Sequence, residues 1–327
     1  MKYRKLGKTG LKVSEISLGT WQVGGKWGSS FNDKSADEII NRAIDSGVNF
    51  IDTADVYENG LSEKAVGRVI RSRSEEVYVA SKCGRQISPH ISKGYAPDVL
   101  QKYVEDSLKR LGIETLDLIQ LHCPPTEVYY RPEIFERFER LKEQGKIKNL
   151  GVSVEKVEEA IKAMEYSNVT TVQIIFNLFR QRPSELFFDL AKKNDIGVIV
   201  RVPLASGLLT GKFSESTKFE SGDHRNFNRD GKAFDKGETF SGIDYSLGLK
   251  AVDELKSIFP NKNLAHIALQ WILKYDAVSC IIPGASKVEH INSNIDVYNS
   301  PELTTDEINK INNIYNKYIK SSVHQLW

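Results

Sequence analysis

The sequence predicts a closed (β/α)8 barrel in a single domain, residues 1–327, and three observations support that prediction. Short apolar, β-branched runs alternate with runs of helical periodicity, and eight such pairs follow one another along the chain. No Gly-x-Gly-x-x-Gly follows the first apolar run, which counts against an open dinucleotide-binding sheet. No break in composition marks a second domain, and α/β barrels commonly reach this length as one domain.

The elements follow one another in a regular order. The run from Ser35 to Ile44 opens with acidic residues, places apolar residues at helical spacing and is followed by Gly47, which predicts a helix with a glycine stop. Later segments repeat this alternation. The predicted strands are 16–19, 49–52, 77–81, 116–121, 149–153, 171–175, 197–202 and 278–283, and the helices that follow them are 35–44, 62–70, 97–111, 131–143, 154–164, 183–193, 264–273 and 288–297.

The largest interruption of this order is a long loop, residues 211–245, after the seventh strand. A loop at that position would overhang the face of the barrel where catalytic residues gather. Its part from Lys212 to Tyr245 carries several Phe side chains, which are costly to leave in water. We therefore expect a mobile flap that orders over a bound cofactor; the alternative is a disordered surface excursion.

Composition argues against several classes of protein. The chain has 45 basic and 43 acidic residues, a net charge of +2, and so lacks the cationic footprint of a nucleic-acid-binding protein. A barrel that binds nucleic acid through the Phe-rich residues 212–245 is disfavoured, because acidic residues are interleaved there. No signal-peptide core and no run of about 20 apolar residues is present, so we expect a cytoplasmic protein without a membrane partner. The sequence does not specify an oligomeric state.

The cysteines predict no metal centre and no disulfide framework. Cys83, Cys123 and Cys280 are an odd number and lack the spacing of metal ligands. Cys83 and Cys123 directly follow Lys82 and His122; if the strands persist that far, alternation would turn their side chains away from those two, and packing is the expected role.

Four residues stand where apolar runs give way to polar sequence: Asp52, Tyr57, Lys82 and His122. Each alone is more often a surface or core residue than a functional one. Parallel α/β proteins, however, keep their chemistry at the carboxyl ends of their strands. A phenol, an amine, a carboxylate and an imidazole brought together there would make a proton-donating site.

These residues and their surroundings resemble the aldo-keto reductases, NAD(P)H-dependent enzymes built on a (β/α)8 barrel. The resemblance runs from Leu18-Gly19-Thr20-Trp21 to Ile282-Pro283-Gly284-Ala285 and includes Asp52-Thr53-Ala54-Asp55-Val56-Tyr57. It implies reduction of an aldehyde or ketone to an alcohol, with NADPH as the favoured cofactor, NADH as the alternative and a small-molecule carbonyl as substrate. A second reading is an NADP(H)-binding regulatory subunit that resembles the potassium-channel β subunits.

The resemblance also implies a role for each catalytic residue. Tyr57 would donate the proton, Lys82 would lower the pKa of Tyr57, and Asp52 would hold Lys82 charged and in place. His122 would orient and polarise the carbonyl oxygen.

The cofactor would lie along the loops at the same end of the barrel. Ser153 and Gln173 would hold the nicotinamide carboxamide, and Asp52 would also contact the ribose. Arg201 stands where many relatives stack an aromatic ring on the nicotinamide; it could stack as well, or reach a phosphate or an anionic substrate. The remaining implied contacts are Gly19, Thr20 and Trp21 near the nicotinamide, Pro203, Leu204, Ser206, Gly207, Leu208 and Lys212 at the pyrophosphate, and Gly284, Ser286, Lys287, His290 and Asn294 at the adenosine end.

Two further features concern cofactor choice and the substrate pocket. His290 replaces the Arg that often contacts the 2′-phosphate of NADPH, which leaves Lys287 as the expected cationic contact. Trp21, with Tyr57 and His122, is a candidate substrate contact, although core packing explains a Trp equally well. Trp27, Tyr318 and Trp327 could also close the pocket.

Overall fold

The computed structural model describes residues 1–25 and 27–327 and contains eight parallel strands that pair in chain order. Bridges from Ile16 to Ile281 and from Gly19 to Gly284 join the first strand to the last, so the sheet curls into a nearly closed barrel. A Cβ on Gly19 would lie 2.7 Å from the Ile282 carbonyl oxygen, so this seam requires glycine. The (β/α)8 prediction is confirmed. The strands are β3 (Leu18–Gly19), β4 (Phe50–Asp52), β5 (Tyr78–Cys83), β6 (Leu118–His122), β7 (Leu150–Ser153), β8 (Val169–Ile175), β9 (Gly197–Arg201) and β10 (Val278–Ile281).

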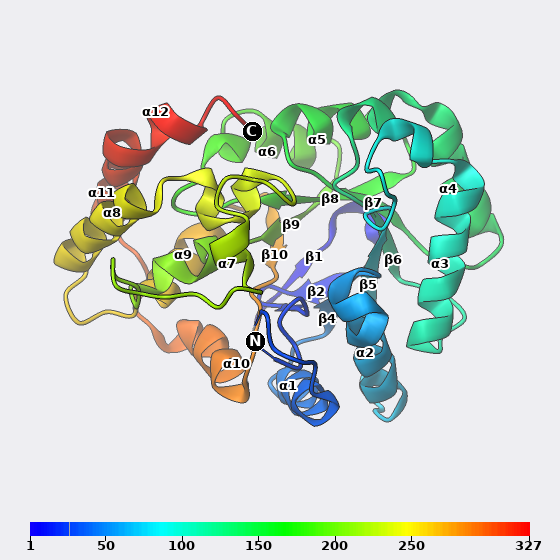
Figure 1. The fold of residues 1–327 in the computed structure, drawn as a ribbon, viewed down its shortest axis with the longest axis horizontal. Helices are drawn as coiled ribbons and strands as arrows, with labels where there is room; N and C mark the ends of the chain where they lie inside the picture. The colour runs from blue at the N-terminus through cyan, green and yellow to red at the C-terminus, as the bar shows by residue number, and fades with distance from the viewer. Residues whose placement is uncertain (26) are drawn as a thin grey trace.

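The helices that follow the strands form a ring around the barrel (Figure 1). Two of the predicted helices start later than expected. Residues 154–156 are not helical because the Glu159 carboxylate accepts from the backbone N–H groups of Glu155 and Lys156 and caps the helix there. Residues 182–184 form a separate 3₁₀ turn. The ring comprises α1 (Asp33–Asp45), α2 (Leu61–Arg71), α3 (Pro97–Leu111), α4 (Pro132–Glu143), α5 (Val157–Ala163), α6 (Phe187–Lys193), α9 (Leu264–Leu273) and α10 (Val288–Ile295).

A hairpin that the sequence analysis missed covers the end of the barrel where the strands begin. It pairs β1 (Tyr3–Lys5) with β2 (Lys12–Ser14). Leu6 and Val13 are fully buried and pack against the barrel interior. The amino end of the barrel is therefore closed by apolar contacts, which leaves the carboxyl end for polar chemistry.

Additional helices flank the barrel on one side, at the left of Figure 1. They are α8 (Tyr245–Ile258), α11 (Thr305–Ile314) and α12 (Lys320–Val323), with a π-helical turn, Tyr315–Ile319, between the last two. The core has two parts: a large cluster between strands and helices, and a smaller one inside the barrel.

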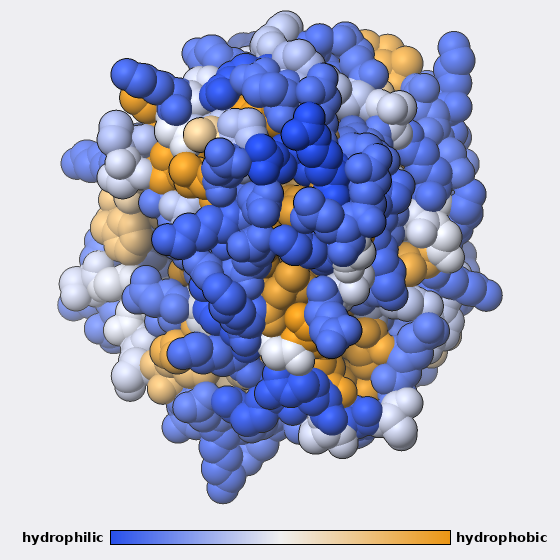
Figure 2. Space-filling view, turned by 90° about the vertical axis from the view of Figure 1, so that its right-hand side faces the viewer, coloured by the Kyte–Doolittle hydropathy of each residue, from blue (hydrophilic) through white to orange (hydrophobic). Residues whose placement is uncertain are grey.

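The surface opposite that flank is mainly hydrophilic, with small recessed apolar areas (Figure 2). Among the described residues, no helix has the length and hydropathy needed to cross a membrane.

The predicted long loop, 211–245, is folded across the carboxyl end of the barrel. It contains α7 (His224–Phe227) and two 3₁₀ turns, Lys236–Glu238 and Phe240–Gly242, and α7 lies in front of the strands in Figure 1. Phe240 is buried, whereas Phe227 is 44 % exposed. The loop also meets the segment after β3, because Gly222 approaches Gly28 so closely that a Cβ on Gly222 would lie 2.9 Å from its Cα.

Candidate active site

Asp52, Tyr57, Lys82 and His122 come together at the carboxyl end of the barrel. Asp52 ends β4, Lys82 lies one residue before the end of β5, and His122 ends β6. The Lys82 ammonium donates to the Asp52 carboxylate and to the Tyr57 hydroxyl, the latter at 3.2 Å. The rings of Tyr57 and His122 are nearly perpendicular, with centroids 6.0 Å apart.

The turn after β4 sets the position of Tyr57. Thr53 N–H donates to the Ala80 carbonyl and Asp55 N–H to the Lys82 carbonyl, so the turn is fixed to β5. Glu58 and Asn59 then adopt left-handed φ angles of 47° and 53°, which ends the turn before α2. The Lys82 ammonium also donates to the Thr53 carbonyl at 2.9 Å.

Electrostatics keep the phenol protonated and the amine charged. Burial disfavours the Lys82 ammonium, but Asp52 and Tyr57 together outweigh burial and raise the pKa of Lys82 above its ordinary value. Burial raises the pKa of Tyr57, and the opposing effect of Lys82 does not cancel it. Lys82 thus acts on the pKa of Tyr57 in the expected direction, but burial has the larger effect and the net shift is upward. Tyr57 is therefore a protonated phenol at neutral pH, with the Lys82 ammonium next to its hydroxyl.

Asp52 is the centre of a buried polar network that the sequence analysis only partly anticipated. Its second carboxylate oxygen accepts from Gln120 at 2.9 Å and from Gln173 at 2.8 Å. Gln120 was missed, although a Gln inside the apolar strand β6, two residues before His122, is the kind of signal that marks an inward polar contact. Ser153 is fully buried, and its hydroxyl lies 3.4 Å from the Cys123 sulfur.

His122 is a neutral imidazole at physiological pH. Burial lowers its pKa well below the ordinary value, and the cations Arg85, Lys82 and Arg201 act in the same direction. A neutral imidazole can donate one hydrogen bond from a ring nitrogen without transferring its proton. The predicted role in orienting a carbonyl oxygen fits this charge state.

An aromatic wall covers Tyr57. Trp21 stacks on Tyr57 with ring centroids 6.1 Å apart, and His224 of the long loop stacks on Trp21 at 4.9 Å. Phe234 meets Trp21 edge-on, and Trp27 meets His224 edge-on. Trp21 and Trp27 thus line the site rather than the core, and the loop residues His224 and Phe234 were not expected there.

Arg201 lies in a buried ion cluster. Its guanidinium donates to the Glu155 carboxylate at 2.9 Å and lies 3.7 Å from the carboxylate of Glu238 in the long loop. Arg85 donates to the same Glu238 carboxylate at 2.8 Å. Cys123 joins this cluster through a contact of 3.4 Å with Arg201. The strand does not persist to Cys123: β6 ends at His122, and Cys123 has a left-handed φ of 46°. The prediction that its side chain turns away from the site is therefore wrong. Cys83 does pack in the core between strands and helices.

The same cluster contains side chains of the types that bind metals, but the arginines already supply the positive charge that a metal ion would bring. Ligand atoms of Cys123, Glu155 and Glu238 lie within 4.8 Å of one another. The ion pairs of both carboxylates with Arg85 and Arg201 occupy that space with positive charge. We assign no metal to these residues.

The predicted pyrophosphate loop forms a tight turn after β9. Ser206 and Gly207 have φ angles of 56° and 93°, and a Cβ on Gly207 would lie 3.0 Å from the Phe213 ring, so glycine is required here. The Ser206 hydroxyl donates to the Glu238 carbonyl at 3.0 Å, which ties this turn to the long loop. Near the nicotinamide end, Thr20 is buried and donates to the Asp52 carbonyl at 3.1 Å. Pro203, Leu204 and Leu208 belong to the same segment as the turn, and Gly19 lies at the barrel seam.

Basic groups gather at the predicted adenosine end. Burial lowers the pKa of His290, and the positive charges of Lys287 and Lys212 lower it further. His290 accepts from the Ser286 backbone N–H at 3.3 Å. Two exposed ammonium groups beside a half-buried, neutral imidazole suit a phosphate monoester. Gly284 is exposed and Asn294 is buried in the same segment.

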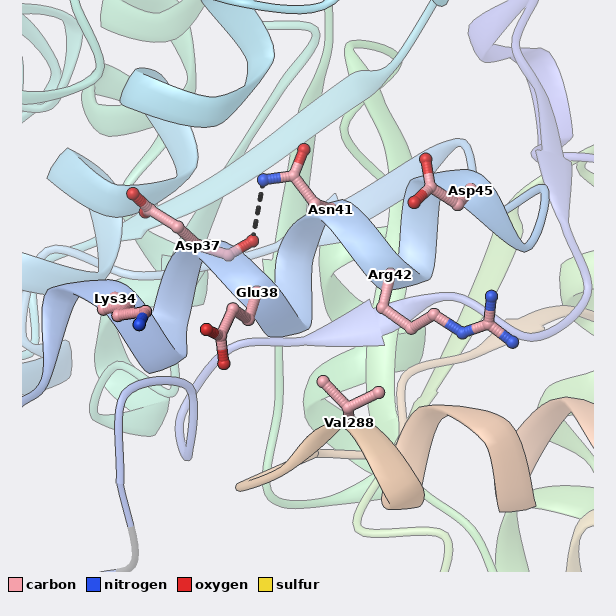
Figure 3. Close-up of a pocket in the computed structure, with 7 residues that line it drawn as sticks. All are labelled: Lys34, Asp37, Glu38, Asn41, Arg42, Asp45 and Val288. Atoms are coloured by element: carbon pink, nitrogen blue, oxygen red, sulfur yellow. Dashed lines mark hydrogen bonds between the residues drawn. The ribbon is translucent and has the colours of Figure 1, made fainter.

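Two aromatic residues and one surface hollow lie away from the catalytic group. Tyr318 donates to Glu254 of α8, and Trp327 packs under Arg180 with 4.2 Å from guanidinium to ring. A hollow of about 700 Å³ between α1 and α10 is lined mainly by charged side chains such as Asp37 and Arg42 (Figure 3). None of these side chains belongs to the catalytic group.

The chain belongs to the aldo-keto reductase family, whose members are NAD(P)H-dependent oxidoreductases. The family's sequence model, described as "Aldo/keto reductase family", matches residues 15–316. An uncharacterized oxidoreductase of Bacillus subtilis, YqkF, is 32 % identical over 316 residues, 94 % of each chain.

Solved structures agree with this assignment. The holo form of the aldo-keto reductase AKR11C1 from Bacillus halodurans has a TM-score of 0.79 at 25 % identity and covers 100 % of this chain and 99 % of its own. The glycerol dehydrogenase AKR11B4 from Gluconobacter oxydans has a TM-score of 0.79 at 30 % identity and covers 97 % and 96 %.

Proposed function

We propose that the protein reduces an aldehyde or ketone to an alcohol, with Tyr57 as the proton donor and NADPH as the preferred cofactor. The observation that carries the proposal is the buried Lys82 ammonium, which bridges the Asp52 carboxylate and the Tyr57 phenol. When bound, the reduced nicotinamide supplies the hydride that the carbonyl carbon accepts.

The residues of this chain then manage the proton. As negative charge develops on the carbonyl oxygen, the Tyr57 hydroxyl gives up its proton to it, and the Lys82 ammonium stabilises the resulting phenolate. Asp52 keeps Lys82 charged throughout, since it offsets the cost of burial. A ring nitrogen of neutral His122 would hold the carbonyl oxygen next to Tyr57.

The cofactor assignment depends on the chemistry of the loops. Arg201 and Ser153 would flank the nicotinamide, and the turn at Ser206 and Gly207 would take the pyrophosphate through backbone N–H groups. Lys212, Lys287 and His290 favour NADPH over NADH, because only NADPH carries a 2′-phosphate. One buried polar atom is available to a bound polar ligand such as the cofactor: the Arg201 Nε atom has no hydrogen-bond partner among the described residues.

A role as a regulatory subunit is less well supported. A probable voltage-gated potassium channel subunit beta of rice is 28 % identical over 330 residues, 95 % of each chain, but no feature of the described site favours binding over turnover. Wild-type turnover distinguishes the two roles, since a subunit that acts through a partner would bind NADPH and reduce carbonyls very slowly.

The test of the proposal is Tyr57→Phe with Tyr130→Phe as the matched control. Tyr130 is 64 % exposed on the outer surface. Loss of a general acid should lower kcat for a reactive aldehyde by about 10²–10⁴-fold, while NADPH affinity, followed by fluorescence titration, changes no more than a few-fold. Near-wild-type turnover by Tyr57→Phe would remove Tyr57 from the role, and the control should match wild type in both measurements.

A further inference from the structure

Arg85 lies beside Arg201 in a pair of arginines, and the reduction of a simple aldehyde gives Arg85 no role. Arg85 comes from the segment after β5 and Arg201 ends β9, and both face the Glu238 carboxylate, at 2.8 Å and 3.7 Å. Glu238 belongs to the long loop and not to the barrel. The carboxylate that neutralises these arginines is therefore brought to them by a separate segment.

We propose that Arg85 and Arg201 form the acceptor for an anionic group, a carboxylate or phosphate, on the carbonyl substrate, and that Glu238 occupies this acceptor until the loop withdraws. The inference rests on the proposed function and names the substrate class for that same site. Guanidinium groups bind carboxylates and phosphates through directed, charge-assisted hydrogen bonds, and the Glu238 carboxylate stands in for such a group.

The distribution of charge between barrel and loop supports this proposal. The barrel side contributes three guanidiniums, Arg85, Arg180 and Arg201, and one carboxylate, Glu155. Burial raises the pKa of Glu155, which weakens its negative charge further. Burial also opposes ionisation of Glu238, but Arg85 and Arg201 outweigh it and lower the pKa of Glu238 to about 2. The loop residue Asp235 also acts on Arg180, so withdrawal of the loop would leave an excess of buried positive charge that an anion can offset.

The acceptor is close enough to the reacting groups to take a small substrate. Arg201 lies 3.4 Å from the sulfur of Cys123, the residue that directly follows His122. The Arg85 guanidinium also lies 5.5 Å from the Phe234 ring, which contacts Trp21 of the aromatic wall. A carbonyl held at Tyr57 and His122 would thus place an anionic group a few bonds away next to Arg85.

Arg85 is the residue to substitute, because its side chain is 18 % exposed and that of Arg201 only 10 %; the Tm of Arg85→Gln without ligand shows whether the variant folds. The test compares kcat/KM for two matched pairs: succinic semialdehyde with butyraldehyde for a carboxylate, and glyceraldehyde 3-phosphate with glyceraldehyde for a phosphate. In Arg85→Gln, the ratio of kcat/KM for the anionic aldehyde to kcat/KM for its neutral partner should fall about 10–100-fold in whichever pair carries the anion that the site binds. In Glu238→Gln, the same ratio should rise, because the competing carboxylate is gone. Arg140→Gln, on the exposed side of α4, should leave the ratio unchanged.

The opposite changes expected for Arg85→Gln and Glu238→Gln distinguish an anion-binding site from an ion pair that only stabilises the fold. A merely structural ion pair would make both substitutions lower the ratio or leave it unchanged, and either result overturns the proposal. A binding measurement is independent of turnover: succinate or inorganic phosphate should raise the Tm of Glu238→Gln more than that of wild type and should not raise the Tm of Arg85→Gln. If no carbonyl is reduced, the proposed function fails and this Tm series still decides whether the anion acceptor exists. If neutral aldehydes alone are reduced and no anion raises the Tm, only the acceptor is refuted.

Discussion

The substitution Asp52→Asn removes the negative charge at the centre of the site and leaves the shape of the side chain nearly unchanged. Asparagine keeps the size of the side chain and an oxygen that can accept from Gln120 or Gln173, but it removes the charge that faces Lys82. Lys82 is fully buried, and its remaining acceptors are the Thr53 carbonyl and the Tyr57 hydroxyl. We expect Lys82 to lose its proton in the folded variant, because burial then acts on the ammonium without compensation.

The cost of that deprotonation can be worked out from ordinary pKa values. An unfolded lysine titrates near 10.4, so holding it neutral at pH 7 costs about 4.6 kcal/mol, at about 1.36 kcal/mol for each of roughly 3.4 pH units. This agrees with the roughly 3–5 kcal/mol lost when one partner of a buried ion pair is removed. The folded-state pKa now lies below the unfolded one, so the unfolded state binds more protons and stability rises with pH. The penalty should shrink to about 1.9 kcal/mol at pH 9.

Urea unfolding of wild type and Asp52→Asn at pH 7 and pH 9 measures both quantities. The double variant Asp52→Asn/Lys82→Met is the control, since it has no amine to titrate and should lose the extra pH dependence. A penalty below about 1 kcal/mol at pH 7, or one that does not shrink at pH 9, would refute the view that Asp52 exists to hold Lys82 charged.

Two further predictions concern the cofactor. Lys287→Ala should raise the KM for NADPH by on the order of 10-fold and change that for NADH little, because one charge-assisted contact to the 2′-phosphate is lost; equal effects in steady-state kinetics would move the phosphate contact to His290. Limited trypsin digestion at Arg229 and Lys232 should slow at saturating NADPH if the long loop closes over the cofactor, and equal cleavage rates with and without NADPH would reject the flap.

The barrel could be predicted because its signals are local. Each strand is short, apolar and followed by a helix of clear periodicity, and α3 and α9 have the predicted bounds, Pro97–Leu111 and Leu264–Leu273. The hairpin β1–β2 was missed because its strands are three residues long and largely polar, and their pairing depends on a tertiary contact in which Leu6 covers the barrel floor. α8 was missed because it stands outside the alternation of one strand with one helix, although Leu249, Val252 and Leu255 recur at helical spacing.

The meeting of Asp52, Tyr57, Lys82 and His122 could be predicted for a related reason. Asp52, Lys82 and His122 stand at or next to strand ends, Tyr57 lies in the turn after β4, and a parallel barrel brings all strand ends to one face. Arg85, Glu155 and Glu238 could not be found in this way, because their contact joins two barrel loops to a distant third loop. No sequence pattern specifies which face of a 35-residue loop meets the barrel, so only the folded chain shows Glu238 beside Arg85.

Loop 211–245 contacts both the turn proposed to take the pyrophosphate and the arginine pair proposed to take an anion. Ser206 of the pyrophosphate turn donates to the Glu238 backbone, while the Glu238 carboxylate faces Arg85. A displacement of that turn by a bound cofactor would therefore move Glu238 itself. If the proposals hold, cofactor binding and release of the arginine pair are linked through one residue, and NADPH should increase the Tm shift that succinate or phosphate gives to the wild-type protein.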